Sequence, residues 1–160
     1  MVLSGDACQN VRMRVLVLGG YGLIGGEIIR RLRADDFVVI GLGRSQALGR
    51  RAAPDIDWIT ADIAKLRTPE AWAPHLLGVD AVVNASGALQ DGARDDLQAL
   101  QADAIAALVT ACERTAVQHF VQISAPGSTH AADTTFLRSK AAGDDALRAS
   151  SLSYVIFKPG

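Results

Sequence analysis

The glycine-rich segment Gly19–Gly25 places the strongest constraint on how this chain folds. It reads Gly-Gly-Tyr-Gly-Leu-Ile-Gly and follows Arg14–Leu18, a short apolar run typical of a strand buried on both faces. It leads into Leu23–Arg33, which predicts an amphipathic helix because its large apolar residues share one face. Those residues are Ile24, Ile28, Ile29 and Leu32. A strand, a tight turn and a helix in this order predict the first unit of a doubly wound sheet.

The rest of the chain alternates short apolar runs with longer amphipathic stretches. Further strands are expected at Phe37–Leu42, Ile56–Thr60, Ala81–Ala85, His119–Ser124 and Ser153–Phe157, and further helices at Asp95–Thr115 and Thr135–Ala149. The Gly-, Arg- and Ala-rich segment Gly43–Pro54 is expected to be a surface loop. This alternation predicts an α/β fold: a doubly wound parallel sheet (a Rossmann fold) of about six strands in the order 3-2-1-4-5-6.

Composition excludes several classes of protein. The 49% of hydrophobic residues exclude disorder over the whole length, and a net charge of −1 favours neither nucleic acid nor an anionic membrane. Cys8 and Cys112 are too few for a disulfide framework or a metal cluster, and Cys112 is expected to be a small buried residue. No apolar run approaches the roughly 20 residues of a membrane span.

The chain is expected to form one dinucleotide-binding domain over residues 13–160, preceded by a flexible extension over residues 1–12. The extension lacks the apolar centre of a signal peptide, so a cytoplasmic location is expected. Pro159 and Gly160 follow the last expected strand directly, before anything covers the ligand-binding edge of the sheet. We therefore expect the chain to be part of a longer protein.

The glycine turn is expected to bind a pyrophosphate. Gly19 allows a tight turn, Gly22 lets the backbone approach the phosphates, and Gly25 lets the helix lie close to the sheet. Tyr21, Leu23 and Ile24 belong to the same turn and are expected to contact the cofactor with it. The helix N-terminus favours the negative charge. The alternative is a tight turn without a ligand.

The end of the second strand favours NADP(H) over NAD(H). An acidic residue there would bind the ribose 2′-hydroxyl of NAD, but the sequence continues with Arg44 and Ser45. A guanidinium binds a 2′-phosphate through two hydrogen bonds, and the serine hydroxyl adds a donor. The alternative is that Arg44 is a solvated loop residue.

Two further groups follow the third and fourth strands. Asp62, with Ile63 beside it, is expected either to accept from the adenine amino group or to cap the next turn. The small residues Ala85, Ser86 and Gly87 would leave room for the nicotinamide ribose, unless they form only a polar turn.

Taken together, these residues resemble the short-chain dehydrogenase/reductase superfamily in its extended or atypical branch, from residue 13 to residue 160. The chain is similar to relatives of the NADPH-binding accessory subunit of respiratory complex I and to the N-terminal part of bacterial fusions with a DoxX-type membrane domain. The resemblance implies a further C-terminal region, with a location at the membrane face. The segments that carry it are Gly19–Gly25, Gly43–Ser45, Ala61–Asp62, Asn84–Gly87, Gln122–Ser124, Ser139–Lys140 and Lys158–Gly160.

The same resemblance implies a catalytic set of Ser, Tyr and Lys. Ser124 matches the serine and Lys140 the lysine, which also binds the nicotinamide ribose, but Phe136 stands at the tyrosine position. Phenylalanine carries no proton, so the usual general acid–base group is absent; such a group contributes about 10²–10⁴-fold. The alternatives are a surface helix lysine at 140 and a small packing residue at 124.

The remaining polar residues carry less information. Thr134 or Asp133 is expected to cap the following helix, and the acidic pairs Asp95–Asp96 and Asp144–Asp145 to be solvated. Related proteins often pair through long helices such as the one expected at Asp95–Thr115, so a homodimer is one expectation.

Three functions follow from these residues. The first is an NADP(H)-binding domain without ordinary dehydrogenase chemistry. The second is an active NADPH-dependent oxidoreductase or epimerase-like enzyme on a small carbonyl or isoprenoid-like substrate. The third, an interaction domain without a cofactor, is the weakest because of the glycine turn.

Overall fold

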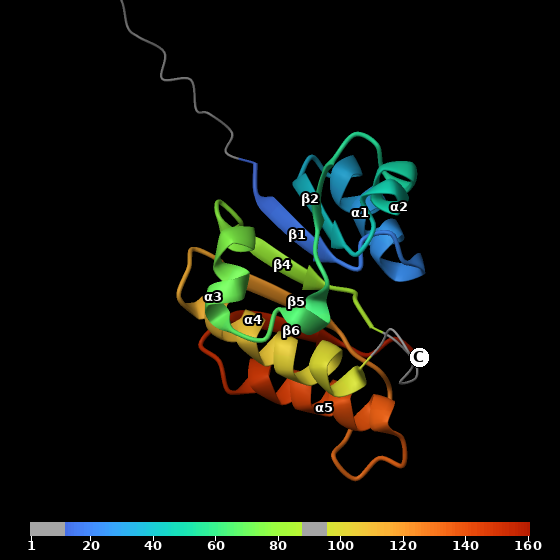
Figure 1. Cartoon of the computed structure of the whole chain (residues 1–160), viewed down its shortest axis with the longest axis vertical. Helices are drawn as coiled ribbons and strands as arrows, with labels where there is room; N and C mark the ends of the chain where they lie inside the picture. Colours follow the sequence, from blue (N-terminus) through green and yellow to red (C-terminus); the bar gives the residue numbers. More distant parts are fainter. Residues whose placement is uncertain (1–11, 88–95) are drawn as a thin grey trace, which may run out of the picture.

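The computed structural model describes residues 12–87 and 96–160, and its centre is a parallel sheet of six strands (Figure 1). The strand order is β3-β2-β1-β4-β5-β6, which confirms the predicted order and fold class. The strands are β1 (Arg14–Leu18), β2 (Val38–Gly43), β3 (Asp57–Thr60), β4 (Ala81–Asn84), β5 (His119–Ile123) and β6 (Ser153–Phe157).

The central strands are largely apolar because both of their faces are covered. In β1, Leu16 and Leu18 pack into the larger core, while Val15 and Val17 pack into a second core on the opposite face. Successive side chains of a strand point to opposite faces, so a continuous apolar run serves two cores at once.

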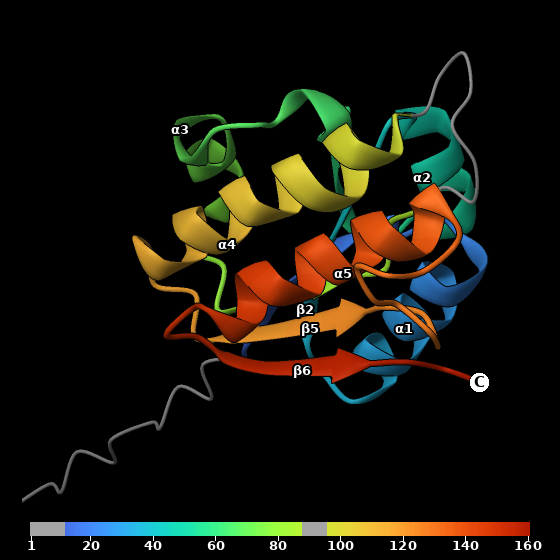
Figure 2. The same cartoon turned by 90° about the horizontal axis from the view of Figure 1, so that it is seen from below.

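The helices that follow β3, β4 and β5 in the chain cover one face of the sheet (Figure 2). The fully buried Trp72 anchors this layer, and its indole nitrogen donates to the Ala104 carbonyl at 3.0 Å. The elements of the layer are the short helices η1 (Ile63–Lys65) and η2 (Ala73–Leu76), α3 (Pro69–Trp72), the π-helix η3 (Ala99–Asp103), α4 (Ala104–Glu113) and α5 (Thr135–Arg148).

The other face carries α1 (Leu23–Ala34) and α2 (Gln46–Ala52). The expectation of a surface loop over Gly43–Pro54 is wrong, because most of that segment is α2. The Ser45 hydroxyl caps the helix by accepting from the Leu48 N–H. The indole of Trp58 packs on Gly49, where an added Cβ would lie 2.5 Å from the ring. This tertiary contact holds a segment whose local pattern gives little sign of a helix.

The face under β5 and β6 extends beyond the reach of α1. Ile24 was expected to face the core, yet it is 46% exposed. It lines an apolar groove with Ile28, Val121, Val155 and Phe157, the last two of which are more than half exposed. Helix α1 packs on β1 and β2, so the first turn of its apolar stripe lies at the edge of the covered area.

The other boundaries differ from the predictions by one or two residues. The expected helix over Asp95–Thr115 is helical from residue 97 to 113, with a π-helical turn, and Asp95 lies outside the described residues. Thr134 caps α5 as predicted, by accepting from the Leu137 N–H. Cys112 is buried as predicted, whereas Cys8 lies outside the described residues. Within residues 12–87 and 96–160, no helix is long and apolar enough to span a membrane.

Candidate cofactor-binding site

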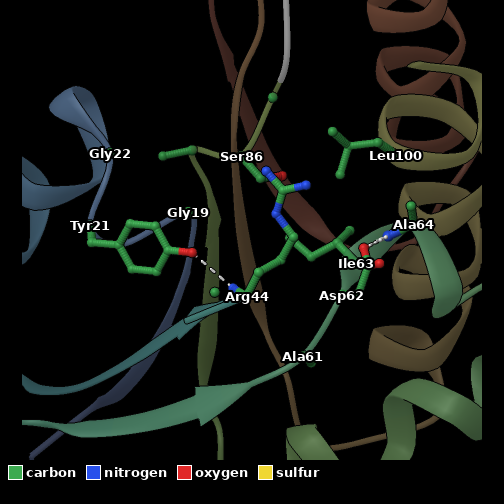
Figure 3. Close-up of a pocket in the computed structure, with 13 residues that line it drawn as sticks. Gly19, Tyr21, Gly22, Arg44, Ala61, Asp62, Ile63, Ala64, Ser86 and Leu100 are labelled. Atoms are coloured by element: carbon green, nitrogen blue, oxygen red, sulfur yellow. Dashed lines mark hydrogen bonds between the residues drawn. The ribbon is translucent and has the colours of Figure 1, made fainter. Parts of the chain in front are cut away.

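A pocket lies at the carboxyl ends of β1 to β4 (Figure 3). Parallel sheets of this kind bind their ligands at this edge. The pocket brings together nine of the residues predicted to bind a cofactor: Gly19, Tyr21, Gly22, Arg44, Asp62, Ile63, Ala85, Ser86 and Gly87. Leu23, Ile24, Gly25, Ser45 and Lys140 are not among the residues that line it.

The glycine turn is close-packed on the protein side and open on the pocket side. Gly19 has a φ of +70°, and a Cβ there would lie 2.9 Å from the Ala85 carbonyl oxygen. At Gly25 a Cβ would lie 2.2 Å from the Gly19 carbonyl oxygen. At Gly22 the nearest described atom would be that same oxygen, at 3.2 Å. Gly19 and Gly25 are thus required by packing, whereas Gly22 leaves space for a ligand.

Helix α1 begins directly after Gly22, which lines the pocket. Gly22 is the N-cap of the helix and provides no side-chain acceptor for the N–H groups of its first turn. Free N–H groups and the helix dipole together favour an anion such as a pyrophosphate. This part of the site therefore fits the phosphates of a dinucleotide.

Arg44 lies at the end of β2 and is exposed. Figure 3 shows its guanidinium extending across the pocket toward Ser86 and Leu100. The Ser45 side chain caps α2 instead of lining the pocket. A guanidinium at this place can bind an anionic group through two hydrogen bonds.

Asp62 shows the capping interaction that was one of its two predicted roles. Its carboxylate accepts from the Ala64 N–H at 3.2 Å at the start of η1. The carboxylate also lines the pocket, so the role toward adenine stays a prediction.

The end of β4 is held by buried amide side chains. Asn84 Oδ1 accepts from the backbone N–H of Ser86 at 3.1 Å and from its hydroxyl at 2.5 Å. The Asn84 amide nitrogen donates to Gln122 Oε1 on the neighbouring strand at 2.9 Å. This network fixes the backbone over Ala85 and Ser86, which forms one wall of the pocket.

Lys140 is buried at 5% exposure, so the alternative of a surface helix lysine is wrong. Its Nζ donates to the carbonyl oxygens of Ser86 at 3.2 Å and Ile123 at 3.1 Å. Burial lowers the pKa of Lys140 to about 8, against a smaller opposing effect of the Asp144 charge. A Cβ added to Gly87 would lie 3.3 Å from this Nζ, which places the amine directly behind the pocket wall.

Asp144 is fully buried, so the expectation that it is a solvated surface residue is wrong. Its Oδ2 accepts from the hydroxyls of Ser124 at 2.7 Å and Ser128 at 3.2 Å, and Lys158 Nζ lies 3.8 Å away. Its Oδ1 has no hydrogen-bond partner among the described residues. Asp144 follows Lys140 by one helical turn, and that spacing is the one sequence signal that places it on the same buried face.

Two of the residues that the resemblance matched to a catalytic set, at positions 124 and 136, are at least partly buried. Ser124 is buried, and its hydroxyl proton is directed to Asp144. Phe136 is half-buried in the first turn of α5. Among the described residues, no group of three His, Cys, Asp or Glu side chains is arranged to hold a metal ion.

A six-stranded sheet of this order, with a glycine turn between β1 and α1 at its ligand-binding edge, defines a dinucleotide-binding Rossmann domain. The model of a family described as NAD(P)H-binding matches residues 19–160, and the chain belongs to this family. The predicted relation to the short-chain dehydrogenase/reductase superfamily is confirmed.

Two known proteins are similar in sequence to this chain. The photosystem II assembly factor Ycf39 of Synechocystis is 30% identical over 152 residues, which cover 91% of this chain and 44% of that protein. An uncharacterized chloroplastic protein of Arabidopsis thaliana is 30% identical over 116 residues, covering 69% of this chain and 36% of that protein. The chain therefore spans less than half the length of these two relatives.

Solved structures show the same fold. A Bacillus halodurans protein described as an NAD-dependent epimerase/dehydratase superposes with a TM-score of 0.77 at 25% identity, over 92% of this chain and 70% of that one. The Bordetella bronchiseptica enzyme WbmH, solved with NAD⁺, gives 0.76 at 21% identity, over 92% and 56%.

Proposed function

We propose that this chain is the NADP(H)-binding domain of an atypical short-chain dehydrogenase/reductase-like protein that lacks the usual catalytic tyrosine. The observation that carries the choice of NADP(H) is Arg44, whose guanidinium extends across the pocket from the end of β2. No acidic side chain follows β2 at the position where NAD-selective sheets place one. The anionic oxygens of a 2′-phosphate would accept hydrogen bonds from this guanidinium more strongly than the neutral 2′-hydroxyl of NAD would.

The residues around the expected reaction centre favour binding over ordinary dehydrogenase chemistry. Phe136 has no proton to exchange with a carbonyl or an alcohol. The Ser124 hydroxyl donates to a buried carboxylate at 2.7 Å and has no second proton with which to polarise a substrate oxygen. Lys140 Nζ donates to the carbonyl oxygens of Ser86 and Ile123 behind the pocket wall, and its third proton would be the one to bind the nicotinamide ribose.

Binding measured on two arginine variants tests this proposal. Arg44→Ala is expected to weaken NADPH binding by about tenfold or more and to change NADH binding little, because a charged hydrogen bond contributes about 1.5–3 kcal/mol. Arg51→Ala, an exposed arginine of α2 outside the pocket lining, is the matched control. Equal losses for both cofactors in Arg44→Ala, or none, would argue against NADP(H) selection by this residue.

A second candidate is an active NADPH-dependent oxidoreductase or epimerase-like enzyme on a small carbonyl or isoprenoid-like substrate. It is favoured by the buried Lys140 amine, whose pKa of about 8 lies close to neutral pH, and by structural neighbours described as epimerases. NADPH oxidation with a panel of carbonyl compounds, abolished in Lys140→Ala, would support it. Absence of turnover in wild type together with measurable NADPH binding would favour the binding domain.

The relation to Ycf39 suggests how a binding domain of this kind is used. That relative is described as an assembly factor, not by a reaction. We propose that NADP(H) has a regulatory or stabilising role in this chain. A homodimer, a cytoplasmic or membrane-face location and a further region after residue 160 stay predictions.

A further inference from the structure

The side chain of Tyr21 connects the phosphate-binding turn to the end of β2. Its ring packs on Gly43, where an added Cβ would lie 2.3 Å from Cε1 of the tyrosine. On another side the ring approaches Trp58, with the ring centroids 5.9 Å apart. These contacts fix the ring, so its hydroxyl lies at a defined place in the wall of the pocket (Figure 3).

The hydroxyl of Tyr21 already accepts two hydrogen bonds. The backbone N–H groups of Arg44 and Ser45 donate to its oxygen at 2.9 and 3.2 Å. Both acceptor positions of the oxygen are thereby used, and its own proton remains to be donated. Within residues 12–87 and 96–160, no acceptor for that proton is found. The Tyr21 hydroxyl lies in the pocket wall, so its proton is available to a ligand that offers an acceptor.

The position of this donor identifies the part of the ligand it meets. The residues after β2 recognise the adenosine ribose in sheets of this type, at its 2′ position. A 2′-phosphate presents anionic oxygens, which accept a hydrogen bond more strongly than the neutral hydroxyl of NAD. The same oxygen also holds the backbone of Arg44 by accepting from its N–H, so the tyrosine positions the arginine as well.

We infer that Tyr21 is a specificity-determining residue, whose hydroxyl donates to the 2′-phosphate of the bound dinucleotide. This inference rests on the proposed NADP(H) binding and assigns it a second donor beside Arg44. In a chain without this hydroxyl, the N–H groups of Arg44 and Ser45 would themselves face the ribose. Tyr21 accepts from these two donors and offers its hydroxyl proton in their place.

The experiment compares two ligands that differ only at the 2′ position, adenosine 2′,5′-bisphosphate and adenosine 5′-monophosphate, by calorimetric titration. Tyr21→Phe keeps the ring contacts and removes the hydroxyl. The variant is expected to bind the bisphosphate about tenfold or more weakly, the loss typical of a hydrogen bond to a charged group. Its affinity for the monophosphate is expected to stay within twofold (about 0.4 kcal/mol). Tyr154→Phe, which removes the other tyrosine hydroxyl from the edge strand β6, is the matched control.

Each other outcome overturns the inference in a recognisable way. An equal loss for both ligands would make Tyr21 a structural support of the turn. Tighter bisphosphate binding would mean that the freed N–H groups are better donors than the hydroxyl. Unchanged binding would mean that the hydroxyl does not reach the ligand. If wild type bound the bisphosphate no better than the monophosphate, the proposed NADP(H) preference would fail, and the inference with it.

Discussion

Two neighbouring glycines of α1 provide a sharp test of the phosphate-binding turn. A Cβ at Gly25 would lie 2.2 Å from the carbonyl oxygen of Gly19 and 3.0 Å from Cα of Gly20. A Cβ at Gly26 would meet only an ordinary contact, 3.7 Å from the Gly20 carbonyl oxygen. Substitution by alanine is therefore expected to lower the stability of the fold at Gly25 and to raise it at Gly26.

The magnitudes follow from two opposing contributions. Replacing a helical glycine by alanine gains about 0.8–1.0 kcal/mol of helix propensity at either position. At Gly25 the clash is with backbone, which cannot rotate away, and overpacking of this kind costs about 1–3 kcal/mol, occasionally more. Gly26→Ala should therefore be stabilised by up to about 1 kcal/mol. Gly25→Ala should be destabilised by up to about 2 kcal/mol, because the clash with the backbone carbonyl at 2.2 Å outweighs that gain.

Thermal unfolding and NADPH titration of both variants measure this difference. For a domain of this size 1 kcal/mol corresponds to about 2–4 °C, so Tm should rise in Gly26→Ala and fall in Gly25→Ala. NADPH binding should weaken only in Gly25→Ala, because the displaced Gly19 carbonyl also accepts the Gly22 N–H that closes the turn. If Gly25→Ala were as stable as Gly26→Ala and bound NADPH equally well, the close packing of helix and turn would be refuted.

Three further predictions concern the pocket and the buried charges behind it. Gly22→Val should retain the fold, because a φ of −72° suits any residue and the contact of its Cβ with the Gly19 carbonyl oxygen, at 3.2 Å, needs a shift of only a few tenths of an ångström. The variant should lose NADPH binding in a titration, and retained binding would contradict the phosphate site. Burial lowers the pKa of Lys140 from 10.5 to about 8, so the unfolded chain binds more protons between these values. The stability of wild type relative to Lys140→Met should then rise from pH 8 to pH 10.5 by on the order of 3 kcal/mol in urea unfolding, and a flat difference would contradict this burial. Asp144→Ala should cost about 1–3 kcal/mol, because the Ser124 and Ser128 hydroxyls, 3.2 Å apart, could then bond only to each other and one proton would have no acceptor. Asp145→Ala on the surface should cost less than about 1 kcal/mol, and equal costs would contradict the described network.

The sheet and the glycine turn could be predicted because their signals are local. Continuous apolar runs such as Arg14–Leu18 require burial on both faces, and a strand, a glycine turn and an amphipathic helix in sequence leave few alternative topologies. The position of the pocket could be predicted as well, because the carboxyl ends of parallel strands meet at one edge of the sheet.

The predictions that are wrong concern residues whose surroundings are set by residues distant in the sequence. Helix α2 depends on Trp58, which packs on Gly49 from the following strand. The burial of Asp144 depends on Ser124 and Ser128, which lie 20 and 16 residues away in sequence. From the sequence alone an adjacent acidic pair such as Asp144–Asp145 is expected to be solvated, because no local pattern indicates the hydroxyls that Asp144 meets. The hydrogen bonds of the Tyr21 hydroxyl could not be predicted either, because their donors lie at the end of a different strand.

Thermal unfolding of wild type with NADPH and NADH side by side tests the central claim most directly. A ligand at 100 times its dissociation constant stabilises the fold by about 2.7 kcal/mol. At about 2–4 °C per kcal/mol, this corresponds to a rise in Tm of roughly 5–11 °C. We predict such a rise with NADPH, and a much smaller one with NADH at the same concentration. An unchanged Tm with both cofactors would contradict the assignment of this pocket as an NADP(H) site.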